Sequence, residues 1–210
     1  MMMRKALVLI ILLFGSAAGA QTKTIAALGD SLTAGYGLPD GQGFVPQMQA
    51  WLTARGHDVR VINAGVSGDT TAGGFARVEW TLTDDVQAVA VALGGNDLLR
   101  ALPVEVTRDN MHGIATAISA RDLPLLIVGF KAPGNYGPAY QADFDAVYPD
   151  VAAEFGTVYA EEFLGALRAL GMAEGRKFMQ SDGIHPNADG VALIVENLGP
   201  SFEELLARIE

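Results

Sequence analysis

Cysteine is absent from the 210 residues of this chain, and its absence removes several kinds of chemistry at once. Disulfide bonds, thiolate metal sites, cysteine nucleophiles and a lipid anchor on an N-terminal cysteine are all excluded. Histidine is nearly as scarce, since the chain holds three, His57, His112 and His185. An imidazole base would have to be one of these residues.

Basic residues are in the minority, because 14 Lys and Arg face 24 Asp and Glu and leave a formal net charge of −10. Polyanions repel such a chain, so nucleic acid and an anionic membrane surface are disfavoured as main partners. Nucleotide-binding signatures are missing as well. The sequence has no Walker A motif and no dinucleotide fingerprint, and Gly29-Asp30-Ser31 has neither the lysine nor the glycine spacing of such loops.

The first 20 residues have the pattern of a signal peptide. Arg4 and Lys5 form a short basic region, and Ala6 to Phe14 is an uninterrupted apolar run. Ala18-Gly19-Ala20 then matches an A-x-A cleavage site in front of Gln21. The alternative, a permanent membrane anchor, is disfavoured because the apolar run is too short to cross ~30 Å of hydrocarbon.

Cleavage near Ala20 would leave residues 21–210, which we predict to form a single domain. We expect this mature protein to be periplasmic or secreted, without stable membrane insertion, and monomeric.

Five continuous apolar runs alternate with segments of helical periodicity. Runs without polar alternation are typical of parallel strands that helices cover on both faces. The predicted fold class is therefore a three-layer α/β/α sandwich around a five-stranded parallel sheet. The runs are Thr24–Leu28, Val59–Asn63, Ala88–Leu93, Leu125–Phe130 and Thr157–Ala160, and the helical segments are 44–55, 104–120, 139–154 and 188–208.

Glycine-rich polar loops follow the first three of these strands. Ligands of open parallel sheets bind at the carboxyl ends of the strands. Ser31 follows the first strand, Gly68 the second and Asn96 the third, so all three should reach one crevice. Ser31 sits on a sharp turn after Gly29-Asp30, where we expect its hydroxyl to be exposed.

Ser31 is the candidate nucleophile, and a serine hydroxyl needs a base to accept its proton. His57 lies in a helix-to-strand turn at the opposite end of the predicted sheet, and His112 lies within a helix. His185 is in a loop before the last helix, with Asp182 three residues ahead of it. That spacing lets the Asp182 carboxylate reach Nδ1 while Nε2 faces Ser31.

Acyl transfer also requires donors to the developing oxyanion. The backbone N–H groups of Ser31 and Gly68 and the side-chain NH₂ of Asn96 are the candidates. The simpler interpretation is that Gly68 and Asn96 only shape turns. A metal site is poorly supported, since His185 and Asp182 are too few ligands for zinc.

Three aspartates also stand at strand-to-helix junctions, namely Asp30, Asp69 and Asp97. A carboxylate at such a place accepts backbone N–H bonds and favours the helix dipole, so we interpret all three as helix N-caps.

Taken together, these segments resemble the sequence blocks of the SGNH (GDSL) hydrolase family, in the same order, from about Thr24 to the C-terminus. The G-x-S-x-G elbow of ordinary α/β-hydrolases is missing, which agrees with this resemblance. Within the family the chain is most similar to the exported bacterial thioesterase I, lysophospholipase and arylesterase group. The matching segments are Gly29–Leu32, Val66–Thr70, Gly94–Asp97 and Asp182–Pro186, with 34–37 and 133–137 pointing to the group.

The resemblance implies a flavodoxin-like fold and a Ser31-His185-Asp182 triad with no cofactor. It implies an oxyanion hole made of Ser31, Gly68 and Asn96. The implied small-molecule substrates are aryl esters, short-to-medium acyl esters, acyl-CoA and lysophospholipids. One loop would flank the acyl site, and its small residues argue against a strong long-chain preference. Its residues are Ala132, Pro133, Gly134, Asn135 and Tyr136.

Two other functions fit part of this pattern. A carbohydrate O-deacetylase would use the same triad, but we would expect exposed aromatic side chains along a groove. A non-catalytic periplasmic binding protein could keep the fold, but it would have no need for Ser31, Asp182 and His185 together.

Overall fold

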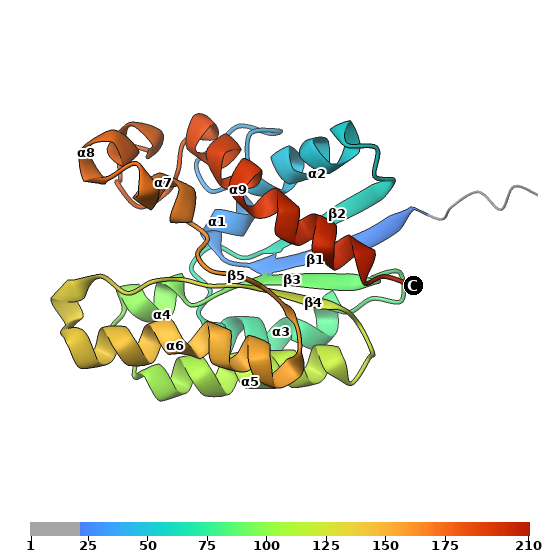
Figure 1. Cartoon of the computed structure of the whole chain (residues 1–210), viewed down its shortest axis with the longest axis horizontal. Helices are drawn as coiled ribbons and strands as arrows, with labels where there is room; N and C mark the ends of the chain where they lie inside the picture. Colours follow the sequence, from blue (N-terminus) through green and yellow to red (C-terminus); the bar gives the residue numbers. More distant parts are fainter. Residues whose placement is uncertain (1–21) are drawn as a thin grey trace, which may run out of the picture.

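The computed structural model describes residues 22–210, so the predicted signal peptide lies outside the described residues. Within that range the chain forms a five-stranded parallel sheet in the order β2-β1-β3-β4-β5 (Figure 1). The fold class predicted from the sequence is confirmed. The strands are β1 (Lys23–Gly29), β2 (Val59–Gly65), β3 (Ala88–Ala92), β4 (Leu125–Val128) and β5 (Val158–Ala160).

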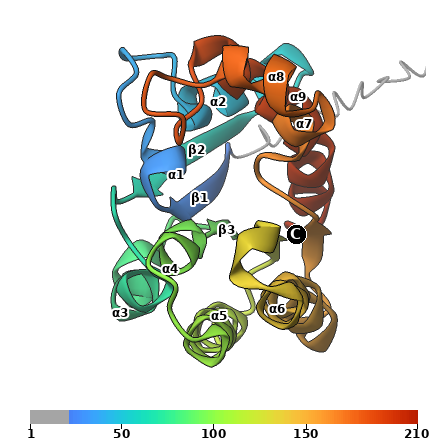
Figure 2. The same cartoon turned by 90° about the vertical axis from the view of Figure 1, so that its left-hand side faces the viewer.

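Helices cover both faces of this sheet. In Figures 1 and 2, α2 and α9 lie on one face, together with α7 and α8, whereas α3, α5 and α6 lie on the other. No helix of residues 22–210 is long and apolar enough to cross a membrane. The long helices are α2 (Phe44–Ala54), α3 (Thr71–Thr81), α5 (Val104–Ser119), α6 (Pro138–Phe155) and α9 (Ala188–Ala207); the shorter ones are α1 (Ser31–Ala34), α4 (Gly95–Leu99), η1 (Gly134–Tyr136), α7 (Gly165–Ala169), α8 (Met172–Gly175) and η2 (Arg176–Phe178).

The inner strands explain the continuous apolar runs. All five residues of β3 and all four of β4 are buried, because helices pack on both sides of them. The edge strand β2 differs from the prediction, since it alternates between buried Val59 and Val61 and exposed Arg60. Successive side chains of a strand point to opposite faces, and α2 packs on β2 from one face, so the side chains on the other face reach water.

The sequence pattern placed Asp69 at the start of a helix but gave no bounds for that helix, which the structure shows as α3. Gly73 and Gly74 lower the helix propensity of its first turn and hid its periodicity. The structure gives Gly74 a packing role, because a Cβ there would collide with the side chain of Leu93. Glycine therefore lets α3 lie close to the end of β3.

A buried tyrosine sets the backbone just after β3. Tyr148 is fully buried, and its hydroxyl donates a 3.1 Å hydrogen bond to the carbonyl of Leu93. Gly94 follows with φ +119, and a Cβ on it would collide with Tyr148 Oη. Only glycine satisfies both the backbone angle and the close approach.

We therefore predict that Gly94→Ala destabilises the protein by about 3 kcal/mol, since it combines a strained backbone with a clash. Gly156→Ala is the matched control, because Gly156 ends α6 at φ +61 with nothing within 4 Å of the added Cβ. That variant should lose only about 1 kcal/mol. Denaturant unfolding measures both, and equal losses would contradict the steric role of Tyr148.

Candidate active site

The carboxyl end of β1 delivers a serine to a histidine that is 154 residues away in sequence. Ser31 is the first residue of α1, and its Oγ lies 2.9 Å from His185 Nε2. His185 Nδ1 lies 2.6 Å from Asp182 Oδ2. The structure thus brings together the three side chains that the sequence singled out, in a continuous chain of hydrogen bonds.

The loop that carries His185 also holds Asp182 in its ionised form. Asp182 Oδ1 accepts hydrogen bonds from the backbone N–H of Ile184 at 2.9 Å and of His185 at 3.0 Å. The pKa of Asp182 is lowered to about 2. The backbone N–H of His185 has the largest effect, followed by the His185 side chain and the backbone N–H of Ile184. The ring of Tyr36 lies against the imidazole, with centroids 4.7 Å apart. The imidazole is therefore held both at Nδ1 and on its face.

Gly68 and Asn96 line the same cleft as Ser31. Gly68 adopts φ +88, a left-handed angle that side chains disfavour, so the turn requires glycine. The Asn96 amide nitrogen donates to the backbone carbonyl of Asp69 at 2.9 Å and, less closely, to Asp30 Oδ2 at 3.3 Å. The first bond ties Asn96 to the loop that carries Gly68.

Arg77, on α3, anchors that loop from behind. Its Nε lies 2.6 Å from Asp69 Oδ2, and its two other nitrogens donate to the carbonyls of Ala64 at 2.8 Å and Gly29 at 2.9 Å. One guanidinium therefore joins the ends of β1 and β2 to the loop between β2 and α3. Asp69 is not a helix N-cap as predicted, because this ion pair occupies its carboxylate while Thr70 caps α3.

Of the other two predicted N-caps, Asp30 is confirmed and Asp97 is not. Asp30 caps α1 by accepting from Leu32 N at 3.0 Å, as predicted. Asp97 lies inside α4, so its prediction as the N-cap there was wrong. Its buried carboxylate instead accepts from Thr71 at both the backbone N, 2.8 Å, and Oγ1, 2.5 Å. Asp97 thus joins the start of α3 to α4 across the sheet edge.

Asp30 is a buried carboxylate directly before Ser31 in sequence, with 2 % of its surface exposed. Burial raises its pKa to about 6, although the Leu32 N–H bond and the charge of His185 act in the opposite direction. Strongly shifted carboxyl groups gather at functional sites, because burial there is tolerated for the sake of geometry.

Ser31 lines a cleft of about 610 Å³. One wall is apolar and comes from α4, the end of β4, and the segments around α7 and His185. Lys131, Arg168 and Glu162 add charged groups beside it, and Arg168 pairs with Glu162 at 2.6 Å. The apolar lining residues are Leu98, Leu99, Phe130, Leu164, Met179 and Ile184.

Of the five loop residues predicted to flank the substrate, Pro133 lines the cleft and the other four do not. Ala132 is buried beneath it with its N–H bonded to Asp145, and the Tyr136 hydroxyl donates to the Leu98 carbonyl. Gly134 and Asn135 belong with Tyr136 to η1, which begins beyond the lining. The segment supports the wall from outside.

The apolar wall of the cleft was not predicted from the sequence. Leu98 and Leu99 directly follow Asn96-Asp97 in sequence, and this apolar pair next to a polar motif was the available signal. The α7 segment carried no signal, since only folding brings it from the far edge of the sheet to the cleft.

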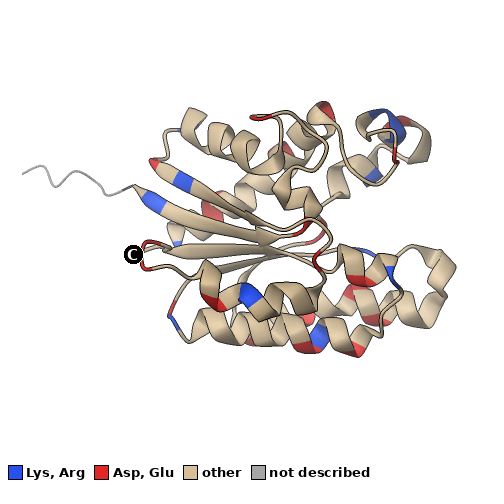
Figure 3. Ribbon diagram, turned by 180° about the vertical axis from the view of Figure 1, so that it is seen from behind, with Lys and Arg blue, Asp and Glu red and all other residues tan. Residues whose placement is uncertain are grey.

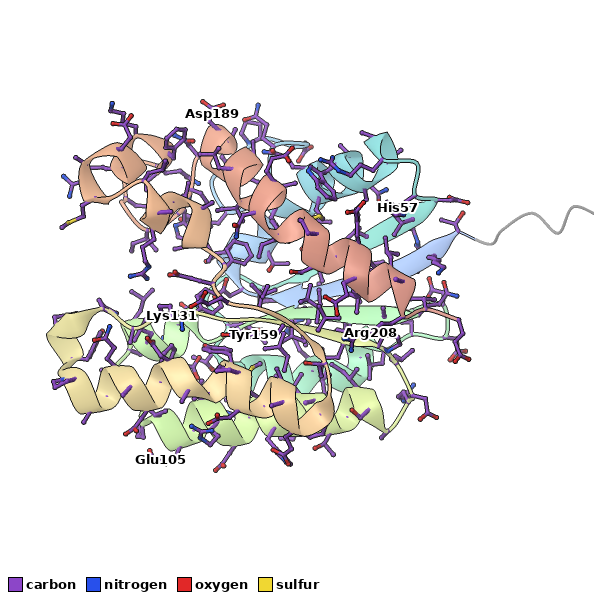
Figure 4. All side chains as sticks on the ribbon, in the orientation of Figure 1. His57, Glu105, Lys131, Tyr159, Asp189 and Arg208 are labelled. Atoms are coloured by element: carbon purple, nitrogen blue, oxygen red, sulfur yellow. The ribbon has the colours of Figure 1, made fainter. Side chains whose placement is uncertain are left out.

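The remaining histidines lie away from this cleft. His57 pairs with Glu203 at 2.9 Å, and Figure 4 shows it toward the end of the sheet where β1 begins. His112 pairs with Glu154 at 3.1 Å on the helical layer of α5 and α6. Within residues 22–210 no three His, Asp or Glu side chains gather in a way that could hold a metal ion.

We predict a pH-dependent cost from the burial of Asp30. Its pKa rises from 3.8 unfolded to about 6 folded, so the folded state binds more protons between these values and loses stability as pH rises through them. Asp30→Asn removes that dependence. The unfolding free energy of the variant relative to wild type should increase by up to about 3 kcal/mol between pH 4 and pH 7.

Denaturant titrations at several pH values measure this difference, and its change with pH is the readout. Asp30→Asn also removes the carboxylate oxygen that accepts from Asn96, but this loss changes the unfolding free energy by the same amount at every pH. Asp40→Asn, in an exposed loop, is the matched control and should give a flat difference. A flat difference for Asp30→Asn too would contradict the assignment.

Comparison with known proteins agrees with this geometry. Residues 27–193 match the model of the GDSL-like Lipase/Acylhydrolase family. The chain is 38 % identical over 188 residues to Esterase TesA of Pseudomonas aeruginosa, covering 89 % of this chain and 91 % of that protein. It is 32 % identical over 201 residues to the Thioesterase 1/protease 1/lysophospholipase L1 of Escherichia coli K12, covering 95 % and 91 %.

A crystal structure of TesA superposes with a TM-score of 0.80 at 37 % identity, covering 87 % of this chain and 99 % of that one. Motifs, fold and relatives agree, and the chain therefore belongs to the GDSL-like lipase/acylhydrolase family and is an enzyme of the ester-hydrolase class.

Proposed function

We propose that the protein hydrolyses carboxylic esters and thioesters through a Ser31-His185-Asp182 triad and an acyl-enzyme intermediate. The observation that carries this proposal is the 2.9 Å approach of His185 Nε2 to Ser31 Oγ, with Nδ1 held by an ionised carboxylate. An imidazole in this position is oriented to accept the hydroxyl proton.

The reaction follows from these contacts. Ser31 Oγ attacks the substrate carbonyl carbon while its proton passes to His185 Nε2, and Asp182 stabilises the imidazolium. The tetrahedral intermediate collapses, the C–O or C–S bond breaks, and His185 returns the proton to the leaving alcohol or thiol. Water then attacks the acyl-enzyme by the same proton transfers, releasing the acid and free Ser31.

The oxyanion would be bound by the backbone N–H groups of Ser31 and Gly68 and by the Asn96 amide. Both amide protons of Asn96 already face acceptors, Asp69 O at 2.9 Å and Asp30 Oδ2 at 3.3 Å. The longer bond is the one that the oxyanion replaces, while the shorter one keeps the amide in place. Because the bond to Asp69 O is kept, the amide has to give up only its longer contact with Asp30 to bind the oxyanion.

The lining of the cleft supports an acyl substrate. Its apolar wall suits aryl esters and short-to-medium acyl esters, and the same site would accept the acyl groups of acyl-CoA and lysophospholipids. The names of the relatives, an esterase and a thioesterase/lysophospholipase, agree with this range. A carbohydrate O-deacetylase is less well supported, because aliphatic side chains outnumber Tyr36 and Phe130 in the lining.

A purely ligand-binding role is also disfavoured. A binding protein gains nothing from an ionised Asp182 hydrogen-bonded to His185 beside Ser31.

Export is part of the proposal and rests on the N-terminal sequence. The basic region, the apolar run and the Ala18-Gly19-Ala20 site would direct the chain to the periplasm or the medium and leave a mature single domain from about Gln21. We propose that this domain works as a monomer and needs no cofactor.

Replacement of Ser31 tests the proposed activity directly. Ser31→Ala should reduce kcat on a p-nitrophenyl acyl ester by at least about 10⁴-fold, since no nucleophile remains, while the fold stays intact. Wild type should also gain one covalent adduct at Ser31 from a serine-reactive phosphonate, seen by mass spectrometry. Unchanged turnover in the variant would refute the proposal.

Arg77 offers a test of the oxyanion hole that leaves the triad in place. Arg77→Met removes three hydrogen bonds behind Gly68 and Asp69, so we expect kcat to fall by about 100-fold with little change in KM. Arg77→Lys should recover part of the loss. Steady-state kinetics on the same ester measure both.

Arg121→Met is the matched control. Arg121 also bonds α3, the helix that carries Arg77, but it does so through Glu79 and the Leu82 carbonyl, far from the cleft. It should keep the wild-type kcat. A shift of KM alone in Arg77→Met, or an equal loss in both variants, would argue against a positioning role for Arg77.

A further inference from the structure

Large apolar side chains are unevenly exposed over the described surface. Among residues 22–210 nine are exposed. Three of them line the cleft, one lines the groove beside it, one ends α7, and one directly precedes the cleft residue Ser67. Contiguous exposed apolar surface marks an interaction site. We call these six the apolar rim: Tyr36, Val66, Leu99, Leu170, Met172 and Ile184.

The rim is continuous with the cleft. Tyr36, Leu99 and Ile184 line the cleft itself. A second, shallower groove of about 210 Å³ lies between α7 and α8, and its lining is mainly apolar. The groove shares Leu164, Arg168 and Met179 with the cleft, so a mainly apolar surface, with Arg168 within it, extends from Ser31 to α8.

Met172 stands at the far end of this surface. It is the first residue of α8, follows Gly171 at φ +77, and is 92 % exposed. Its side chain contributes almost nothing to the protein core, yet a flexible thioether adapts well to an irregular apolar partner. Figure 2 shows α7 and α8 facing the viewer together with α1 and α4, at the end of the molecule where the strands finish. Met172 and the cleft opening therefore belong to the same end.

The charges beside the rim are balanced. Figure 3 shows basic residues in the α7 to η2 region of a chain that is acidic overall. Arg168 and Lys177 of this region have an acidic partner close by, as does Lys131 of the cleft lining, so the surface beside the rim offers charges of both signs. The pairs are Lys131–Glu161 at 3.5 Å, Arg168–Glu162 at 2.6 Å and Lys177–Glu174 at 2.9 Å.

We propose that the apolar rim docks reversibly on a zwitterionic phospholipid surface, from which an acyl chain enters the cleft. Headgroups with paired charges suit the paired charges beside the rim, whereas a net charge of −10 opposes an anionic bilayer. The acyl nature of the substrate rests on the proposed function, but the docking surface itself does not. Side chains such as Met172 would be buried among the headgroups and acyl chains.

Vesicle binding tests this surface separately from catalysis. The mature protein carrying Ser31→Ala is sedimented with sucrose-loaded phosphatidylcholine vesicles, so that no lipid is hydrolysed. It should bind, and Met172→Asp on the same background should need about tenfold more lipid for half-binding. Trp80→Asp is the matched control, because Trp80 is 85 % exposed on α3, outside the rim. It should bind within about twofold of the parent.

Three results would overturn the proposal. These are no co-sedimentation of the parent, equal losses for Met172→Asp and Trp80→Asp, or analytical ultracentrifugation showing that Met172→Asp converts a dimer into a monomer. Anionic vesicles that bind more tightly than zwitterionic ones would overturn the charge argument. With Ser31 intact, Met172→Asp should turn over soluble p-nitrophenyl acetate as wild type does. Failure of the proposed activity would therefore appear in turnover, and failure of the docking proposal would appear in vesicle binding.

Discussion

Parallel pairing of β1 with β2 on one side and β3 on the other is the constraint on which the site depends. In this register Gly29 lies beside Gly65 on one neighbour and beside Ala92 on the other. Neighbouring strands are ~4.8 Å apart, so the loops that leave these three ends start side by side. Residues that follow each strand within a few positions, such as Asn96, therefore lie in one crevice as a direct result of the strand register.

Behind that crevice lies a polar network that holds the loops at fixed separations. Asp69 is its centre, since its carboxylate meets Arg77 and its carbonyl meets the Asn96 amide. Asp30 extends the network beneath Ser31, at the cost of a buried carboxylate whose pKa rises to about 6. Buried polar networks of this kind specify one arrangement because each unmade hydrogen bond would be expensive. Stability is given up at this place for a defined geometry around the nucleophile.

Much of the fold followed from local pattern. The apolar runs of the inner strands and the periodicity of α5 and α9 are properties of short segments, and the structure confirms the elements that they predicted. The bounds of α3 did not follow from periodicity, because Gly73 and Gly74 mask it, and the close packing of Gly74 against Leu93 exists only after folding. The roles assigned to Asp69 and Asp97 were wrong for the same reason. Each carboxylate bonds a residue of α3, and local propensity alone favoured the nearest helix start.

The sequence by itself determined the fold class and which residue types stand after each strand. Asp182 and His185 are three residues apart, so even their mutual contact is a local matter. Tertiary structure alone decided that His185 meets Ser31, that Arg77 joins the ends of β1 and β2 to the loop before α3, and that α7 supplies part of the cleft wall. These contacts join segments far apart in the chain, and their distances depend on how the sheet twists and the helices pack. No short stretch of sequence encodes that arrangement, because it is a property of the whole packed core.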